Sequence, residues 1–162
     1  MGTSEAGEPS LIRLSLIDFF TGDVLLDSLV IPSHPMRHYN TRYSGVSATD
    51  MRNADRSGRC IRGRDAAREL VWQHVGPDTV LVVHGGAGDL AVLRWIHGVV
   101  VDSFLVDRFD GTGEVEGGRS LKNLAWWRVG RVVQEGNGGH DSLEDARACR
   151  ELVHALVGQI PG

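Results

Sequence analysis

The sequence predicts an α/β fold built as one domain over residues 1–162. Two apolar runs near the start, separated by a turn signal, are typical of a β-hairpin. Two short β-branched runs in the middle of the chain alternate with segments of helical periodicity. The resulting order of hairpin, helix, strand, helix, strand, helix and helix predicts an α/β protein with a mixed β-sheet.

Composition and charge narrow the class of protein. Hydrophobic residues make up 41% and charged residues 23% of the chain, which is ordinary for a soluble globular protein. No run approaches the roughly 18 apolar residues of a membrane helix, and the polar, acidic start predicts no secretory signal. Cys60 and Cys149 are expected to be reduced thiols of an intracellular protein. The net charge of −4 argues against broad neutralisation of duplex phosphates, but it permits one strand end to bind in a metal-containing cleft.

The hairpin is expected over residues 11–20 and 24–31, which are rich in Leu, Ile and Val and flank a Thr-Gly-Asp turn signal. Pro32 follows the second run, and because proline cannot donate to a strand ladder, the strand should end there. The other expectations for this half are loops at 1–10 and 34–43, and a short helix that a capping box of Ser47 and Asp50 begins.

The second half is expected to contain two strands that are buried on both faces. Residues 79–83 and 99–101 are continuous apolar runs, as in strands covered on both sides. Helices are expected where apolar residues recur at helical spacing and a serine cap, glycine or proline marks an end. These helices cover residues 65–75, 89–97, 120–129 and 142–157, with loops at 108–118 and 134–139.

Two short motifs carry the chemistry of the sequence. Four residues separate His140 from Asp145 at the start of the last helix, and small alanines follow. Asp89 follows the apolar run 79–83 and His84 after four small residues. These motifs resemble the third and second motifs of the DEDDh-type 3′–5′ exonucleases.

Further segments extend the resemblance over nearly the whole chain. Asp102-Ser103 and the helix start Ser120–Ala125 match recurrent features of the family, and Thr41–Val46 resembles a segment that edges the active site in its RNA-exonuclease branch. The resemblance implies a ribonuclease H-like fold, with a mixed β-sheet and helices on both faces. In that fold the first strand lies centrally, between the hairpin and the strand at 79–83, and it ends in an Asp-x-Glu pair. The sequence has no such pair and starts just past its place, so we expect a domain that is N-terminally incomplete and lacks the first central strand.

The resemblance also implies a reaction and its site. Family members hydrolyse a terminal phosphodiester with two divalent ions, Mg²⁺ or Mn²⁺, which carboxylates hold. By resemblance, Asp89 and Asp145 are metal ligands, and His140 is the general base on water, a role that suits imidazole near neutral pH. The candidate substrate-binding residues are Tyr43, Ser44 and His84. The expected partner is the 3′ end of a single-stranded nucleic acid, with RNA favoured over DNA. A nuclear or nucleolar location is implied by the family alone.

Each candidate catalytic residue also has a simple structural interpretation. Asp145 would pair with Ser142 in a capping box, Asp89 would favour a first helical turn through the helix dipole, and His140 would be an ordinary loop residue. Because the Asp-x-Glu pair is absent, two functions stay open. One is a metal-dependent 3′–5′ exoribonuclease, and the other is an inactive exonuclease-like module that binds nucleic acid or a protein.

A dinucleotide-binding turn is a third interpretation, based on the four residues 85–88 with Asp102 as the ribose acid. The G-x-G-x-x-G spacing is not met and too few strand–helix units follow. The sequence therefore disfavours this interpretation.

Overall fold

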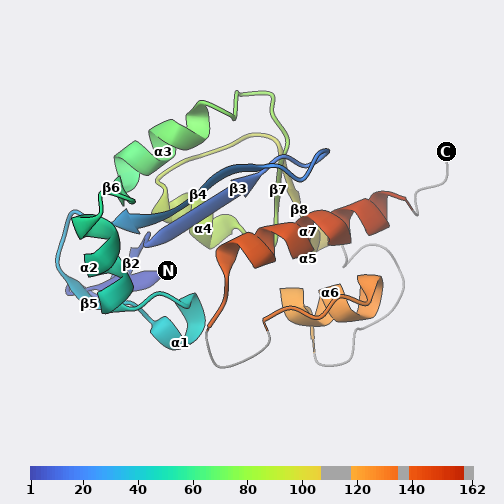
Figure 1. Ribbon diagram of the computed structural model, residues 1–162. Helices are drawn as coiled ribbons and strands as arrows, with labels where there is room; N and C mark the ends of the chain where they lie inside the picture. Colours follow the sequence, from blue (N-terminus) through green and yellow to red (C-terminus); the bar gives the residue numbers. More distant parts are fainter. Residues whose placement is uncertain (107–117, 135–138, 159–162) are drawn as a thin grey trace.

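A computed structural model describes residues 1–106, 118–134 and 139–158 of the chain. In these ranges the strands form three small sheets with helices around them (Figure 1). Within the same residues, no helix combines the length and apolar character that crossing a membrane requires.

The predicted hairpin is confirmed. Strand β3 (Arg13–Ile17) pairs antiparallel with β4 (Val24–Ile31), and β4 pairs in parallel with the two-residue strand β6 (Ile61–Arg62). The turn is fixed by the carboxylate of Asp18, which accepts hydrogen bonds from the backbone N–H groups of Phe20 and Thr21. This sheet is mixed, as the sequence predicts.

The second sheet pairs β7 (Leu81–Val83) in parallel with β8 (Val100–Asp102). The expectation that both strands are buried on both faces is wrong for β8. Val100 at the start of β8 is 37% exposed and the preceding Val99 is 39% exposed, so the sheet faces are not fully covered at this end of the strand. Val80, which was expected to lie in the first of these strands, is also exposed and precedes β7.

Residues 1–10, expected to be a loop, contain two short strands instead. Strand β1 (Gly2–Ser4) pairs with β2 (Pro9–Ser10) and with β5 (Met36–His38), which lies in the other expected loop. Helix α1 (Thr41–Ser44) follows β5. Because β2 lies at an edge of this sheet, Pro9 is compatible with it.

Most helices begin where the sequence predicts. Ser47 and Asp50 form the predicted capping box of α2 (Ala48–Arg56), and Ser120 caps α6 (Leu121–Val129), which Gly130 ends in a left-handed conformation. The helix predicted at 89–97 is shorter, because Arg94 adopts a φ of 48° and ends it. The remaining helices are α3 (Arg64–Trp72), α4 (Ala87–Val92), α5 (Ser103–Val106) and α7 (Ser142–Val157). Helix α7 has the predicted bounds, whereas α5 was not predicted. The loops expected at 108–118 and 134–139 lie mostly outside the described residues.

Helices cover both faces of the hairpin. Side chains alternate along β3, so Leu14 and Leu16 pack toward α3 in a cluster with Val71 and Val75. Arg13 and Ser15 point to the opposite face, where they bond to residues at the start of α7. Figure 1 shows α3 and α7 on opposite sides of the hairpin, and the far side of α7 packs on α6.

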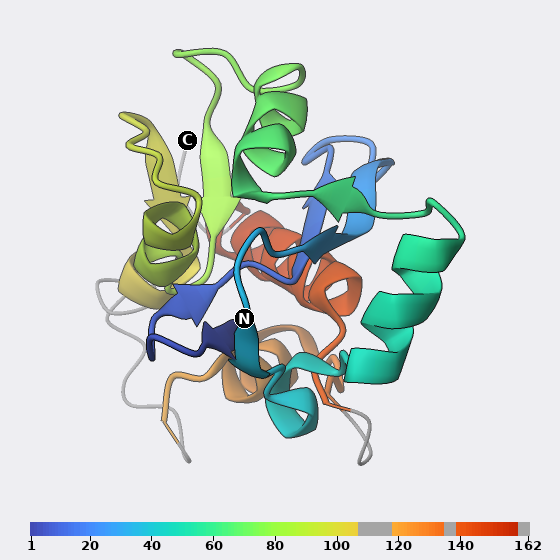
Figure 2. The same ribbon diagram turned by 90° about the vertical axis from the view of Figure 1, so that its left-hand side faces the viewer.

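A cavity of about 540 Å³ lies between the sheet of β3, β4 and β6 and the sheet of β7 and β8. Its walls include residues 11–16 along β3 and Leu81–Val83 of β7, which are edge strands of separate sheets. Helix α7 packs against both strands and is seen behind them in Figure 2. The cavity therefore lies between the hairpin and β7, where the resemblance predicts the first central strand.

Among the described residues, β3 has a strand neighbour on one side only, which is β4. In an antiparallel pair, every second residue directs its N–H and C=O to the partner strand. Val30 donates its N–H to the carbonyl of Ile12, so Ile12 and Leu14 face β4. The backbone groups of Arg13 and Ser15 are then directed away from β4, toward the cavity.

Candidate functional site

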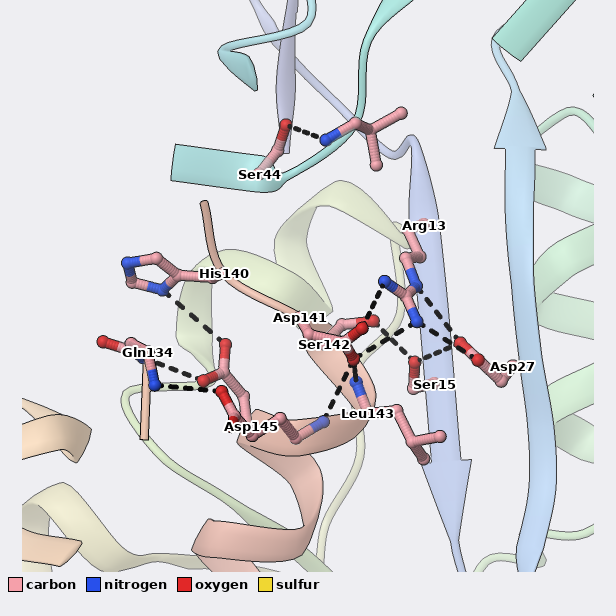
Figure 3. A network of polar contacts seen from close by, with 12 residues as sticks. Arg13, Ser15, Asp27, Ser44, Gln134, His140, Asp141, Ser142, Leu143 and Asp145 are labelled. Atoms are coloured by element: carbon pink, nitrogen blue, oxygen red, sulfur yellow. Dashed lines mark hydrogen bonds and ion pairs between the residues drawn. The ribbon is translucent and has the colours of Figure 1, made fainter. Parts of the chain in front are cut away.

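The start of α7 brings together the imidazole and carboxylate of the third motif. Nδ1 of His140 lies 3.6 Å from Oδ2 of Asp145 (Figure 3). Gln134 donates from Nε2 to Oδ1 of Asp145 at 2.8 Å, and its backbone N–H donates to Glu144. The carboxylate of Asp145 is thus oriented from two sides.

Asp145 is not a capping residue of α7, so the capping-box interpretation with Ser142 is wrong. The cap is Asp141, whose Oδ1 accepts hydrogen bonds from the backbone N–H groups of Leu143 and Glu144. Ser142 instead shares a hydrogen bond of 2.5 Å with Ser15 of β3. The carboxylate of Asp145 is therefore directed to the cavity rather than to the helix backbone.

Asp89 reaches the same cavity from α4, which follows β7. Although much of the residue surface is exposed, the protein around its carboxyl group desolvates it and raises its pKa. The positive amino group of Met1 acts in the opposite direction, and the negative charge of Asp145 raises the pKa further. The carboxylates of the two motifs are therefore close enough to interact electrostatically.

The three candidate substrate-binding residues line this cavity too. Tyr43 is 65% exposed, so its ring is available to a ligand. Ser44 uses its hydroxyl locally, donating to the carbonyl of Tyr39 and accepting from the N–H of Val46. His84 hydrogen-bonds through Nδ1 to Ser103 and contacts the ring of Phe104 edge-on.

The glycine-rich turn after β7 is closed by a side chain. The carboxylate of Asp102 accepts hydrogen bonds from the N–H groups of Gly85 and Gly86. A Cβ at Gly86 would lie 2.6 Å from the Cβ of Val83, so the turn packs tightly on β7. Because Asp102 already occupies the N–H groups that a dinucleotide phosphate would need, the structure offers no support for that interpretation.

A polar network absent from the sequence-based candidates ties the start of α7 to the hairpin. Arg13 donates two hydrogen bonds to Asp141, at 3.1 and 3.2 Å, and two to Asp27 at 3.2 Å (Figure 3). Ser15 donates to Asp27 at 2.7 Å. The alternation of polar Arg13 and Ser15 with leucines along β3 was a signal for such a site.

The donor atoms at the cavity suit a hard divalent cation in part. Carboxylate oxygens are the ligands that such cations prefer, and Asp89 and Asp145 supply them from two helices. Among the described residues, no group of three or more His, Cys, Asp or Glu side chains is arranged to hold a metal ion. A complete site would therefore need further oxygen ligands beside these two.

No family model matches the sequence. The chain is 32% identical over 152 residues to RNA exonuclease 3 of Saccharomyces cerevisiae, an alignment covering 93% of this chain and 34% of that protein. It is 35% identical over 143 residues to human RNA exonuclease 1 homolog, covering 88% of this chain and 11% of that protein. It is 32% identical over 157 residues to Small RNA degrading nuclease 3 of Arabidopsis thaliana, covering 97% of this chain and 19% of that protein. The chain thus spans about a third or less of the length of these relatives.

Solved structures agree with the sequence relatives. The Pan2 pseudoubiquitin hydrolase–RNA exonuclease module of Saccharomyces cerevisiae, in complex with AAGGAA RNA, matches with a TM-score of 0.74 and 25% identity over 94% of this chain and 25% of that one. The complex of the same module with AAGGA RNA matches with a TM-score of 0.73 and 27% identity, over 92% of this chain and 25% of that one. Together with the motifs at Asp89, His140 and Asp145, these similarities show that the chain belongs to the DEDD-type exonuclease family with a ribonuclease H-like fold.

Proposed function

We propose that this chain carries the histidine and two of the carboxylates of a metal-dependent 3′–5′ exonuclease that removes nucleotides from single-stranded RNA. The observation that carries the proposal is the convergence of Asp89, His140 and Asp145 on one cavity, although they come from two motifs about fifty residues apart. The names of the relatives, which are RNA exonucleases, support RNA as the substrate.

His140 is the general base in this proposal. Nδ1 faces the carboxylate of Asp145, and Figure 3 shows the other ring nitrogen pointing away from it. The side chain is 47% exposed, so water reaches the ring. Once His140 accepts a proton from the attacking water, the nearby carboxylate stabilises the imidazolium that results.

Asp89 and Asp145 would hold the divalent ion, Mg²⁺ or Mn²⁺. When bound, the ion supplies charge stabilisation at the attacking and leaving oxygens of the phosphodiester. The negative charge of Asp145 raises the pKa of Asp89, so ionisation of Asp89 beside it is disfavoured. A cation between them would offset this repulsion, which is why this pair fits a metal better than an uncharged ligand.

Tyr43, Ser44 and His84 are the proposed substrate contacts. The exposed ring of Tyr43 offers a face on which a terminal base would stack. His84 and Ser44 lie on the same cavity but engage the protein itself through Nδ1 and Oγ. We therefore assign the larger share of base binding to Tyr43. The nuclear or nucleolar location stays a prediction.

We further propose that turnover requires an extended segment in the cavity, ending in an Asp-x-Glu pair. The edges of β3 and β7 line the cavity, and the apolar side chains of Leu14, Leu16 and Leu81 cluster beside it. Met1 also lines the cavity, so residues joined before Met1 would enter it directly. Such a segment would add the oxygen ligands that the two aspartates lack.

The test compares the 162-residue chain with a form in which an apolar strand ending in Asp-x-Glu precedes Met1. Both are incubated with a single-stranded RNA oligomer and Mn²⁺, or with a chelator, and released 5′-mononucleotides are measured. The extended form should shorten the RNA stepwise from its 3′ end only with Mn²⁺. Asp145→Ala and His140→Ala in that form should lose at least about 100-fold in rate. Asp78→Ala should not, because Asp78 is exposed and is not among the residues that line the cavity.

The second candidate function is an inactive module that binds nucleic acid or a protein. It is favoured by the absence, among described residues, of three or more potential ligands at one point. A folded extended form that binds the RNA oligomer without releasing nucleotides would support the module and refute the exonuclease.

A further inference from the structure

The backbone of His140 is held by helix α1, a contact that neither motif contains. The N–H of His140 donates to the carbonyl of Tyr43 at 2.8 Å. Tyr43 lies in α1, almost one hundred residues earlier in the chain. The imidazole is otherwise an exposed side chain just before the first turn of α7, so this hydrogen bond fixes the point from which the ring projects.

Gly139 makes the contact possible for two independent reasons. Its φ is +80°, a conformation that side chains with a Cβ rarely adopt. A Cβ at this position would also lie 2.6 Å from the carbonyl oxygen of Thr41 and closer still to the backbone nitrogen of Gly45. These two atoms form the hydrogen bond that closes α1, at 2.9 Å, so neither can move aside without opening the turn.

Helix α1 has only four residues and is held in place by side chains. The hydroxyl of Thr41 donates to the carbonyl of Val46 at 2.9 Å, and Ser44 donates to Tyr39 at 2.7 Å. Asn40 adopts a left-handed conformation and donates through Nδ2 to the carbonyl of Met1 and the hydroxyl of Thr3, both at 3.2 Å. These bonds fix a turn that would be unstable by itself.

We propose that the turn Thr41–Gly45 and Gly139 form a backbone clamp that positions His140 against Asp145. On the other side of His140, Arg13 holds Asp141, so the chain is fixed on both sides of the base. Gly139 and Thr41 are positioning residues, and the carbonyl of Tyr43 acts here independently of its ring. The expected effect of the clamp on kcat rests on the proposed function, whereas its effect on the position of His140 does not.

The first arm of the test measures amide hydrogen exchange of His140 in the 162-residue chain, with no need for activity. Gly139→Ala should lose the protection of this amide, because the clash separates it from the carbonyl of Tyr43. Gly58→Ala is the matched control, since Gly58 has a φ of +66° but nothing within 4 Å of an added Cβ. Tyr43→Ala removes the ring and should leave the amide protected. Unchanged protection in Gly139→Ala refutes the clamp.

The second arm uses the extended form with RNA. Gly139→Ala should lower kcat by about 100-fold, the loss expected from a displacement of about 1 Å, with KM nearly unchanged. Thr41→Val, which replaces the hydroxyl with a methyl group, should lower kcat several-fold, whereas Thr41→Ser, which keeps the hydroxyl, should have a kcat close to that of the wild type. If Gly139→Ala does not fold, the kcat values of the two Thr41 variants still test the positioning role. If Gly139→Ala loses the amide protection but keeps the full kcat, the positioning role is refuted. If the amide exchange comes out as expected but the extended form does not degrade RNA, the exonuclease is refuted and the clamp is not.

Discussion

The guanidinium of Arg13 donates two hydrogen bonds to the carboxylate of Asp141 and so joins strand β3 to the capping residue of α7, the helix that carries Asp145. The two residues are 128 positions apart. Since Asp141 also follows His140 directly, this pair links the hairpin to the candidate site.

The charge of Asp141 should stabilise the protein only above acidic pH. Burial tends to raise its pKa, but the N–H of Glu144 and the Arg13 guanidinium outweigh it and hold the pKa below the ordinary value. Stability from this group is therefore present above an unfolded pKa of about 3.9 and is lost as pH falls through the folded pKa. Asp141→Asn, which still caps a helix, should lower the urea midpoint at pH 7 and have less effect near pH 3. Asp141→Ala should cost about 1 kcal/mol more through the lost cap. An equal deficit for Asp141→Asn at both pH values would contradict the charge argument.

Asp89→Asn should raise the melting temperature at neutral pH while removing metal binding. Desolvation raises the pKa of Asp89, so the folded state holds this proton more tightly than the unfolded state. Its ionisation therefore lowers stability as pH rises through that folded pKa. The variant avoids this cost at pH 7 and should match the wild type well below pH 4, where both side chains are neutral. Thermal unfolding at both pH values, with and without Mn²⁺, checks the prediction. If Asp89→Asn melted at a lower temperature than the wild type at pH 7, the ionised carboxylate would be shown to stabilise the folded protein.

Amide exchange along β3 should alternate. The N–H groups of Arg13 and Ser15 are directed to the cavity, whereas those of Leu14 and Leu16 face β4, so the first pair should exchange faster. In the form with a strand before Met1, exchange of Arg13 and Ser15 should slow while Leu14 and Leu16 change little. Residue-resolved exchange by NMR measures both pairs in one sample. Equal protection of all four amides in the 162-residue chain would mean that the edge of β3 is already paired.

Gly86→Ala should destabilise the protein by about 1–3 kcal/mol, the usual cost of overpacking. The added Cβ would meet Val83 at 2.6 Å, although the φ of −73° is compatible with alanine. Gly88→Ala is the matched control, because it lies in α4 and its Cβ would meet only the end of the Met1 side chain at 3.6 Å. Helix propensity should make the control neutral or stabilising. Urea unfolding of the two variants should place them on opposite sides of the wild type or at least clearly apart.

Local sequence signals predicted those parts of the fold that local physics determines. Helix α7 combines a regular apolar stripe with a capping residue, and its bounds were predicted as observed. The hairpin had a clear turn signal between two apolar runs. By contrast, β1 and β2 are so short and rich in Gly, Ser and Pro that no periodicity marks them, and their pairing depends on β5 more than twenty residues away.

The candidate site shows the same limit. His140, Asp145 and Asp89 were recognisable because their spacing forms motifs, but Arg13 and Gln134 were not. Arg13 reaches Asp141 only through the packing of β3 on α7. Gln134 orients Asp145 from the chain after α6. Neither pairing has a fixed spacing, so only the assembled structure brings these residues into the site.

The facing edges of β3 and β7 also bear on how the chain behaves in a concentrated solution. An unpaired strand edge is a template for any extended polypeptide, including one from a second molecule. Both edges line one cavity, so an extended segment of a second molecule could pair there in place of the strand proposed before Met1. Protein concentration, and not temperature alone, should therefore determine how fast the folded chain aggregates. A segment that fills the cavity should slow aggregation as well as complete the site.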